Sequence, residues 1–147
     1  MASIQSILFP TDFSPPSQRA LDYVADLAQR FSARVVLLHV IPPNAYPLHN
    51  LAAVAGFPNL RDEIRKGVDR ELEAQVKRLG QKVATATTVR EGVVHEEILA
   101  ACKEHGCDLV AMATNGHTGL KHAVLGSTAE RIVRLSPKPV LTLRAAD

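Results

Sequence analysis

Five short segments of the chain are almost continuously apolar and rich in β-branched residues. Runs of this kind are typical of strands that are buried on both faces, as in parallel sheets. Only the third run alternates in part between apolar and polar positions. We therefore predict strands at residues 7–9, 35–40, 83–89, 109–113 and 140–143.

Four segments between these strands repeat apolar residues three and four positions apart, which is the spacing of one helix face. The first follows Ser14 and begins with Pro15. Many helices begin in this way, with serine as the N-cap and proline at the first helical position. The second ends at Gly80, a residue type that often follows a helix. The sequence predicts helices over residues 15–31, 60–80, 96–104 and 127–135.

Strand and helix alternate strictly along the chain, and this order predicts a parallel sheet with helices on both faces, joined by right-handed crossovers. We expect an α/β fold, a three-layer α/β/α sandwich with a five-stranded parallel sheet, in a single domain over residues 1–147. The connection over residues 42–58 is long for a compact domain. Its apolar residues suit either a loop that covers the sheet edge or a flap over a ligand or partner.

Composition excludes several classes of function. The chain has 17 lysines and arginines against 15 aspartates and glutamates, without a basic stripe, and it has no tryptophan. Nucleic-acid binding is therefore not expected. No apolar run approaches the roughly 20 residues of a membrane span, and the start of the chain does not resemble a signal peptide. The two cysteines, Cys102 and Cys107, fit no disulfide framework or zinc spacing. We expect a cytoplasmic protein with reduced thiols.

One candidate binding residue follows the first predicted strand. Ligands of open α/β sheets bind beyond the carboxyl ends of the strands. Asp12 stands there, just before the first helix, and its carboxylate suits either hydrogen bonds from a ribose diol or a helix cap. Because Ser14 already suits the cap position, ligand contact is favoured.

A second candidate lies after the fourth predicted strand, where Gly116, Gly119 and Gly126 precede the last helix. Glycines allow close backbone approach, and the free N–H groups of a helix N-terminus attract phosphate. The alternative is a helix that satisfies its own N-terminus, because Ser127 and Glu130 match a capping box. The segment has neither the P-loop pattern nor the placement of a dinucleotide-binding fingerprint.

Four segments carry a further signal: residues 7–14 (ILFPTDFS), 37–41 (LLHVI), 92–98 (GVVHEEI) and 112–144. In this order, and over nearly the whole chain, they resemble the universal stress protein family. The nucleotide-binding branch of that family carries a G-x2-G-x9-G-[S/T] motif. Gly116, Gly126 and Ser127 match its second half, and Ala113 stands at the first glycine. The resemblance implies an adenine nucleotide alpha hydrolase-like fold with strand order 3-2-1-4-5.

The resemblance also implies ATP as the ligand, with Mg²⁺ or Mn²⁺ on its phosphates. Asp12 would hold the ribose hydroxyls, and the backbone of Val40 would meet the adenine edge. The other implied contacts are Pro10 and Thr11 in the pocket wall, Met112 and Ala113 beside the nucleoside, and Asn115, Gly116, Gly126, Ser127 and Thr128 around the phosphates.

Charge near the implied phosphate site differs from the family pattern. Asn115 stands where the family often has histidine or arginine, so it retains a donor but no charge. His117, Lys121 and His122 follow it closely. They either restore positive potential at the phosphates or form a solvated basic face.

No catalytic residue and no protein metal site are predicted. His95 and Glu96 begin an H-E-x-x-H pattern, but Leu99 replaces the second histidine. Ser127 has no histidine placed beside it as in a catalytic triad. His39, inside an apolar strand, is expected to be a core residue. Without a general base or an arginine finger, any ATPase activity is expected to be slow.

The sequence favours a stress-response regulator that binds ATP and acts through a protein partner of unknown identity. Its last strand would lie at a sheet edge, where an apolar strand invites pairing, and the resemblance implies a homodimer through residues 139–144. Two alternatives stay open. Ala113 and Asn115 favour a dimeric interaction module that binds no nucleotide, whereas an enzyme acting on an adenylated substrate would use the same pocket.

Overall fold

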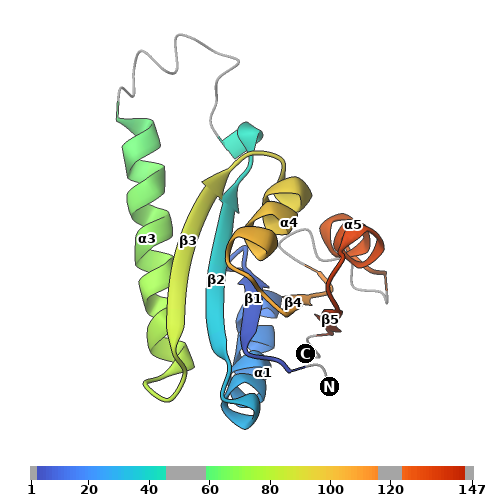
Figure 1. Ribbon diagram of the computed structural model, residues 1–147. Helices are drawn as coiled ribbons and strands as arrows, with labels where there is room; N and C mark the ends of the chain where they lie inside the picture. The colour runs from blue at the N-terminus through green and yellow to red at the C-terminus, as the bar shows by residue number, and fades with distance from the viewer. Residues whose placement is uncertain (1–2, 46–58, 116–123, 145–147) are drawn as a thin grey trace.

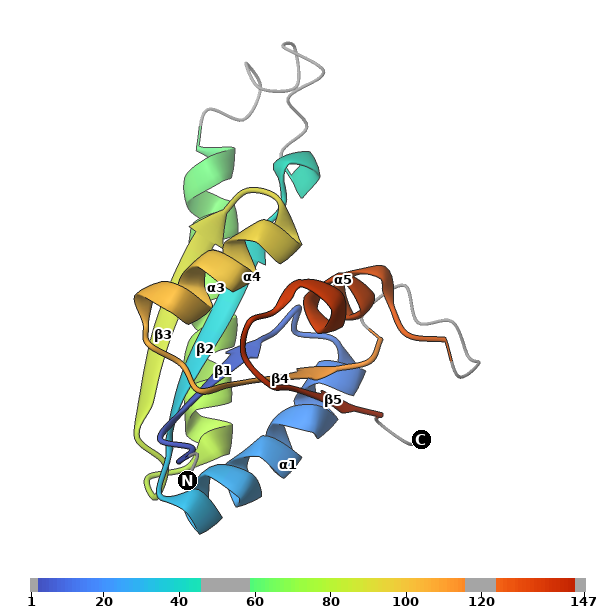
Figure 2. The same ribbon diagram turned by 45° about the vertical axis from the view of Figure 1, so that its right-hand side comes forward.

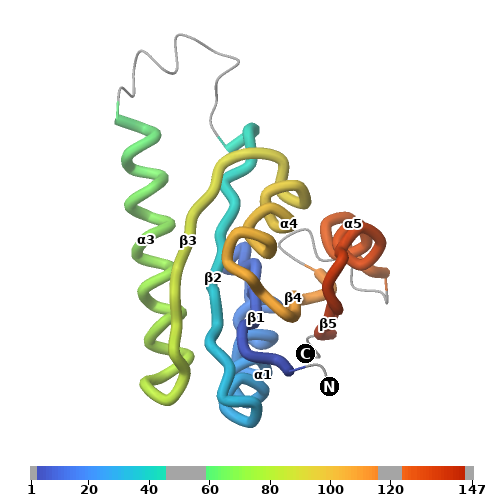
Figure 3. Tube along the Cα trace, in the orientation of Figure 1, coloured from blue at the N-terminus to red at the C-terminus, as the bar shows by residue number. Residues whose placement is uncertain are grey.

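The computed structural model describes residues 3–45, 59–115 and 124–144. Figure 1 and the tube in Figure 3 follow the chain through these ranges from blue to red. Most of the connection 42–58 lies outside the described residues. The elements are β1 (Ser6–Pro10), α1 (Pro15–Phe31), β2 (Arg34–Ile41), the 3-10 helix η1 (Pro43–Ala45), α3 (Leu60–Leu79), β3 (Thr85–Glu91), α4 (Val94–Glu104), β4 (Leu109–Ala113), α5 (Ser127–Leu135) and β5 (Val140–Leu143).

Within the described ranges, the strands form one five-stranded parallel sheet in the order β3-β2-β1-β4-β5, which confirms the predicted fold and order. Ile7 of β1 lies opposite Val35 of β2 on one side and Leu109 of β4 on the other. The chain adds strands to one side of β1 first and to the other side afterwards. The carboxyl ends of β1 and β4 therefore form the switch point at which ligands of open sheets bind.

Alternate side chains of the central strands are buried in two separate layers. In β2, Val35 and Leu37 pack with residues of α1 and α3, whereas Val36 and Leu38 pack with residues of α4 and α5. Figure 2 shows α4 and α5 in front of the sheet and α1 behind it. Each fully buried side chain of this size contributes about 1.5–3 kcal/mol to folding. Burial on both faces explains why the strand is apolar without alternation.

Four elements begin at residues other than those predicted, and for β1 and β2 the difference is a single residue. β3 begins at Thr85 rather than at Val83, because the ladder to β2 opens with a hydrogen bond from the Val35 N–H to the Ala84 carbonyl (2.8 Å). Val83 is buried but lies ahead of that ladder. α4 begins at Val94, two residues before the predicted start. Apolar periodicity locates elements better than it locates their ends.

The helix α3 buries one stripe of side chains, Val68, Leu72, Gln75 and Leu79, against the sheet. Three of these are apolar, as the spacing predicts. Gly80, with φ of +82°, ends the helix as predicted. Figure 1 shows α3 running beside β3 and β2. Neither this 20-residue helix nor another in the described ranges is apolar enough over its length to cross a membrane.

Candidate functional site

A cavity of about 580 Å³ opens at the carboxyl ends of β1, β2 and β4, beside the first turns of α4 and α5. Its volume falls within the range of small-molecule sites. Every predicted site residue in the described ranges lines it: Pro10, Thr11, Asp12, Val40, Met112, Ala113, Asn115, Gly126, Ser127 and Thr128. Gly116, His117, Lys121 and His122 lie outside the described residues. That the lining residues bind a ligand stays a prediction.

The turn between β1 and α1 places Asp12 in the cavity wall. Ser14 caps α1 as predicted, because its hydroxyl accepts the Ser17 N–H (3.3 Å). Asp12 Oδ1 accepts the Ser14 N–H (3.0 Å), so its carboxylate orders the turn rather than the helix end. Phe13 between them has φ of +63°, a left-handed conformation that is uncommon for a residue with a side chain. Thr11 Oγ1 accepts the Phe13 N–H (3.1 Å) and helps to hold this turn.

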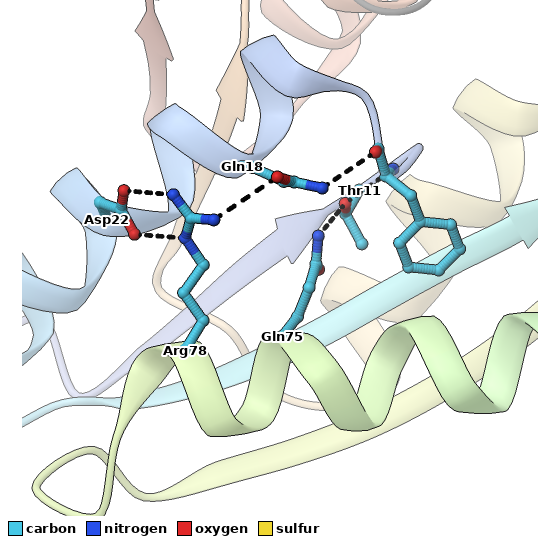
Figure 4. Close-up of polar contacts among 6 residues, drawn as sticks. Thr11, Gln18, Asp22, Gln75 and Arg78 are labelled. Atoms are coloured by element: carbon cyan, nitrogen blue, oxygen red, sulfur yellow. Dashed lines mark hydrogen bonds and ion pairs between the residues drawn. The ribbon is translucent and has the colours of Figure 1, made fainter.

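The hydroxyl of Thr11 joins β1 to two helices. It lies 2.9 Å from Ser17 Oγ of α1, and it accepts a hydrogen bond from Gln75 Nε2 of α3 (3.1 Å). Figure 4 shows Gln75 pointing from α3 towards Thr11, one turn from Arg78, whose guanidinium pairs with Asp22 of α1 (2.6 Å). Sequence reasoning missed Gln75. The one available signal was a glutamine on an otherwise apolar helix stripe.

His39 of β2 supports the same turn and lines the cavity. It is half-buried rather than a full core residue, and its Nδ1 lies 2.7 Å from the Thr11 carbonyl. Because a carbonyl oxygen only accepts, Nδ1 carries the proton of the neutral ring. The ring stacks on Phe13, with centroids 4.5 Å apart. Burial lowers the pKa of His39, although the hydrogen bond to Thr11 and the charge of Asp12 oppose that shift.

The N-terminus of α5 forms the opposite part of the wall. The alternative of a capping box is wrong, because Gly126 is the N-cap and Ser127 is already the first helical residue. The Glu130 carboxylate pairs with Arg134 (3.3 Å) instead of turning back. Among the described residues, no side chain caps this helix. Ser127, Thr128 and the dipole's positive end therefore face the cavity as a candidate anion site.

The neck of the glycine-rich segment is closed by short contacts between residues 114–115 and 124–126. The Gly126 N–H donates to the Thr114 carbonyl (2.8 Å). The side-chain amide nitrogen of Asn115, in the orientation that satisfies its hydrogen bonds, donates to the backbone carbonyls of Thr114 (3.0 Å) and Val124 (2.8 Å). A Cβ on Gly126 would lie 2.9 Å from the Thr114 oxygen. Glycine is thus required here by close approach, since its φ of −60° suits other residues.

The cavity wall also includes residues from outside the recognised motifs. Pro42 and Asn44 come from the chain after β2, and Val94 and Ile98 come from the first turns of α4. These positions carry no motif. Topology was the available signal, because α4 begins at the same edge of the sheet as α5.

The family model of universal stress proteins matches residues 3–144. The chain is 31% identical to the universal stress protein MJ0577 of Methanocaldococcus jannaschii, over 95% of this chain and 94% of that protein. A solved structure of MJ0577 has a TM-score of 0.83 at 30% identity and covers 98% of both chains.

Two more distant solved structures share the fold. One is a universal stress protein in complex with cAMP, with a TM-score of 0.69 at 20% identity over 98% of this chain and 99% of that one. The other is the universal stress protein of Archaeoglobus fulgidus in complex with dAMP, with a TM-score of 0.68 at 14% identity over 97% and 98%. With the family model and a relative above 30% identity both spanning nearly the whole chain, this protein belongs to the universal stress protein family.

Proposed function

We propose that this chain binds an adenine nucleotide, ATP foremost, in the cavity at the carboxyl ends of β1 and β4. The observation that carries the proposal is that one cavity has a negatively charged group on one wall and a helix N-terminus, with its positive dipole end, on another. The Asp12 carboxylate lines one wall, and the uncapped start of α5 lines another. A carboxylate accepts hydrogen bonds from sugar hydroxyls, whereas a helix N-terminus attracts phosphate. A nucleotide carries both groups on one molecule.

The rest of the wall suits the adenine base of a nucleotide. Apolar surface between Asp12 and the start of α5 comes from Val40, Val94, Ile98 and Met112. Two family members have been solved with cAMP and dAMP, which share adenine, a pentose and a phosphate. These ligands support the same chemical class for this chain.

The proposed role of the nucleotide is regulatory. A ligand that binds one conformation better than another shifts the protein towards that conformation, and a partner protein then recognises it. In the described ranges, no group of three or more His, Cys, Asp or Glu side chains is placed to hold a metal ion. Mg²⁺ or Mn²⁺ would arrive with the phosphates of the nucleotide, as is common for phosphate ligands.

The test is calorimetric titration of the purified protein with ATP, AMP and cAMP. We expect Asp12→Ala to weaken binding about tenfold or more, because hydrogen bonds to a charged group contribute roughly 1.5–3 kcal/mol. Asp12→Asn retains an acceptor for the Ser14 N–H and removes only the charge. Asp22→Ala is the matched control, because Asp22 lies on α1 and pairs with Arg78 outside the cavity lining. Flat titrations of the unmodified protein at millimolar nucleotide would refute the proposal.

One observation favours the interaction module as the second candidate. Ala113 adds a methyl group at the first glycine position of the motif, and Asn115 is engaged by two backbone carbonyls. If the protein is an interaction module, titration with ATP, AMP or cAMP should show no binding. Capture of a partner protein should then be the same for Asp12→Ala as for the unmodified protein.

A further inference from the structure

Gln75 is a polar residue at a core position. The residue is 3% exposed within the stripe that α3 packs against the sheet. Among the described residues, Gln75 Oε1 is the one buried side-chain oxygen or nitrogen without a hydrogen-bond partner. An orphaned acceptor of this kind destabilises a fold. Departures from optimal core packing concentrate at functional sites, so Gln75 points to a role beyond packing.

The hydrogen bonds that Thr11 accepts determine which hydroxyl donates in the contact between Thr11 and Ser17. Thr11 Oγ1 accepts from the Gln75 Nε2 and from the Phe13 N–H, each at 3.1 Å. A hydroxyl oxygen has two lone pairs and one proton. Because both lone pairs are occupied, the Thr11 proton donates to Ser17 Oγ, 2.9 Å away. Figure 4 shows the first link of this chain, from Gln75 on α3 to Thr11.

Ser17 stands at the end of the chain of hydrogen bonds and at the cavity. The residue is 3% exposed, and it lines the cavity together with Thr11 and Asp12. Its oxygen accepts from Thr11, so its own proton is left for another acceptor. Within the part of the chain that the structure describes, Ser17 Oγ has no second partner. The cavity is the remaining place for that acceptor.

We propose that Ser17 is a ligand-binding residue whose hydroxyl donates a hydrogen bond into the cavity, and that Gln75 is a positioning residue that sets the direction of this donation through Thr11. The inference rests on the proposed function and extends it. Asp12 offers acceptors to the nucleotide, whereas Ser17 offers a donor from the same wall. Together they select a ligand with hydroxyl groups beside an acceptor atom.

The experiment compares AMP binding by the unmodified protein, Ser17→Ala, Gln75→Met and the double variant. Loss of a neutral hydrogen bond weakens binding about three- to tenfold, and we expect this from each single variant. Gln75→Met retains side-chain length and removes the orphaned acceptor, so its melting temperature should be unchanged or higher. The double variant should bind AMP no more weakly than Ser17→Ala, because both changes act on the same donor. Gln29→Met, at an exposed position of α1, is the matched control.

Each outcome decides between the two proposals. If the unmodified protein binds AMP and both single variants bind it equally well, the role of Ser17 is refuted while the proposed function stands. Additive losses in the double variant would refute the role of Gln75. If the unmodified protein does not bind AMP, cAMP or ATP, the proposed function fails and this inference fails with it. Should Ser17→Ala not fold by circular dichroism, Ser17→Cys retains the size of the side chain with a much weaker donor and is measured in its place.

Discussion

Gly126 offers a test of the neck that closes the glycine-rich segment. Its replacement by alanine would place a Cβ 2.9 Å from the Thr114 carbonyl oxygen, a separation that real Cβ atoms essentially never show. The same oxygen accepts the Gly126 N–H at 2.8 Å, so the contact cannot relax without stretching that hydrogen bond. Forcing an extra carbon into a packed site costs about 1–3 kcal/mol. For a chain of this length, that corresponds to a fall in melting temperature of roughly 2–12 °C.

The same substitution elsewhere in the chain has the opposite expected effect. Gly67 lies inside α3, and the nearest atom to a Cβ placed there is the end of the Arg70 side chain at 3.9 Å. Alanine in a helix interior is favoured over glycine by about 1 kcal/mol. Gly67→Ala should therefore melt roughly 2–4 °C higher than the unmodified protein. Scanning calorimetry of the two variants, followed by AMP titration, measures stability and binding on the same samples.

Gly126→Ala should also weaken AMP binding, because the displaced neck moves the first turn of α5 away from the cavity. Gly67→Ala should leave AMP binding unchanged. If Gly126→Ala melted and bound AMP like the unmodified protein, the close approach of Thr114 and Gly126 would not hold the site in place. Equal melting shifts of the same sign for both variants would likewise contradict the structure.

Three further predictions concern pH, the thiols and assembly. Because burial lowers the pKa of His39, the unfolded state binds more protons, so the free energy of unfolding should fall as pH drops below about 6.5. Urea titrations at pH 5.5 and 7.5 should show a smaller difference in His39→Asn, and an equal difference would contradict this. Burial raises the pKa of the Cys102 and Cys107 thiols, so iodoacetamide should label them slowly in the folded protein and quickly in urea, as followed by mass spectrometry. We propose that β5, at the sheet edge, pairs with a second copy, so solution scattering should give twice the chain mass of 15.9 kDa, and a monomer would refute it.

The fold was predictable because burial leaves a strong periodic signal. The run around Val35 and Leu38 is apolar at nearly every position since α-helices cover both faces of β2, and this pattern alone indicates a parallel sheet. The boundaries of the strands and helices were less predictable. Val83 is apolar and buried like a strand residue, yet it precedes the ladder, because hydrogen bonding and burial do not start at the same residue.

The lining of the cavity was predictable where a motif or a strand end marked it, as at Asp12 and Gly126. The contacts that support this lining were not predictable, because they join elements that are distant in the sequence. Gln75 reaches Thr11 across 64 positions of sequence, and no local pattern records that meeting. The capping box at Ser127 shows the converse case, in which a local pattern matched but the helix began one residue too early to use it.

Two unfavourable features of this chain meet at the hydroxyl of Thr11, a residue of the cavity wall. Phe13, which has a positive φ, donates its N–H to Thr11 Oγ1. Gln75, whose Oε1 is buried without a partner among the described residues, donates to the same oxygen from Nε2. Each feature destabilises the fold by about 1 kcal/mol or more, although glycine at the first position or leucine at the second would avoid it. Because costly residues are retained mainly where a site needs them, their meeting at Thr11 supports a functional role for the turn after β1.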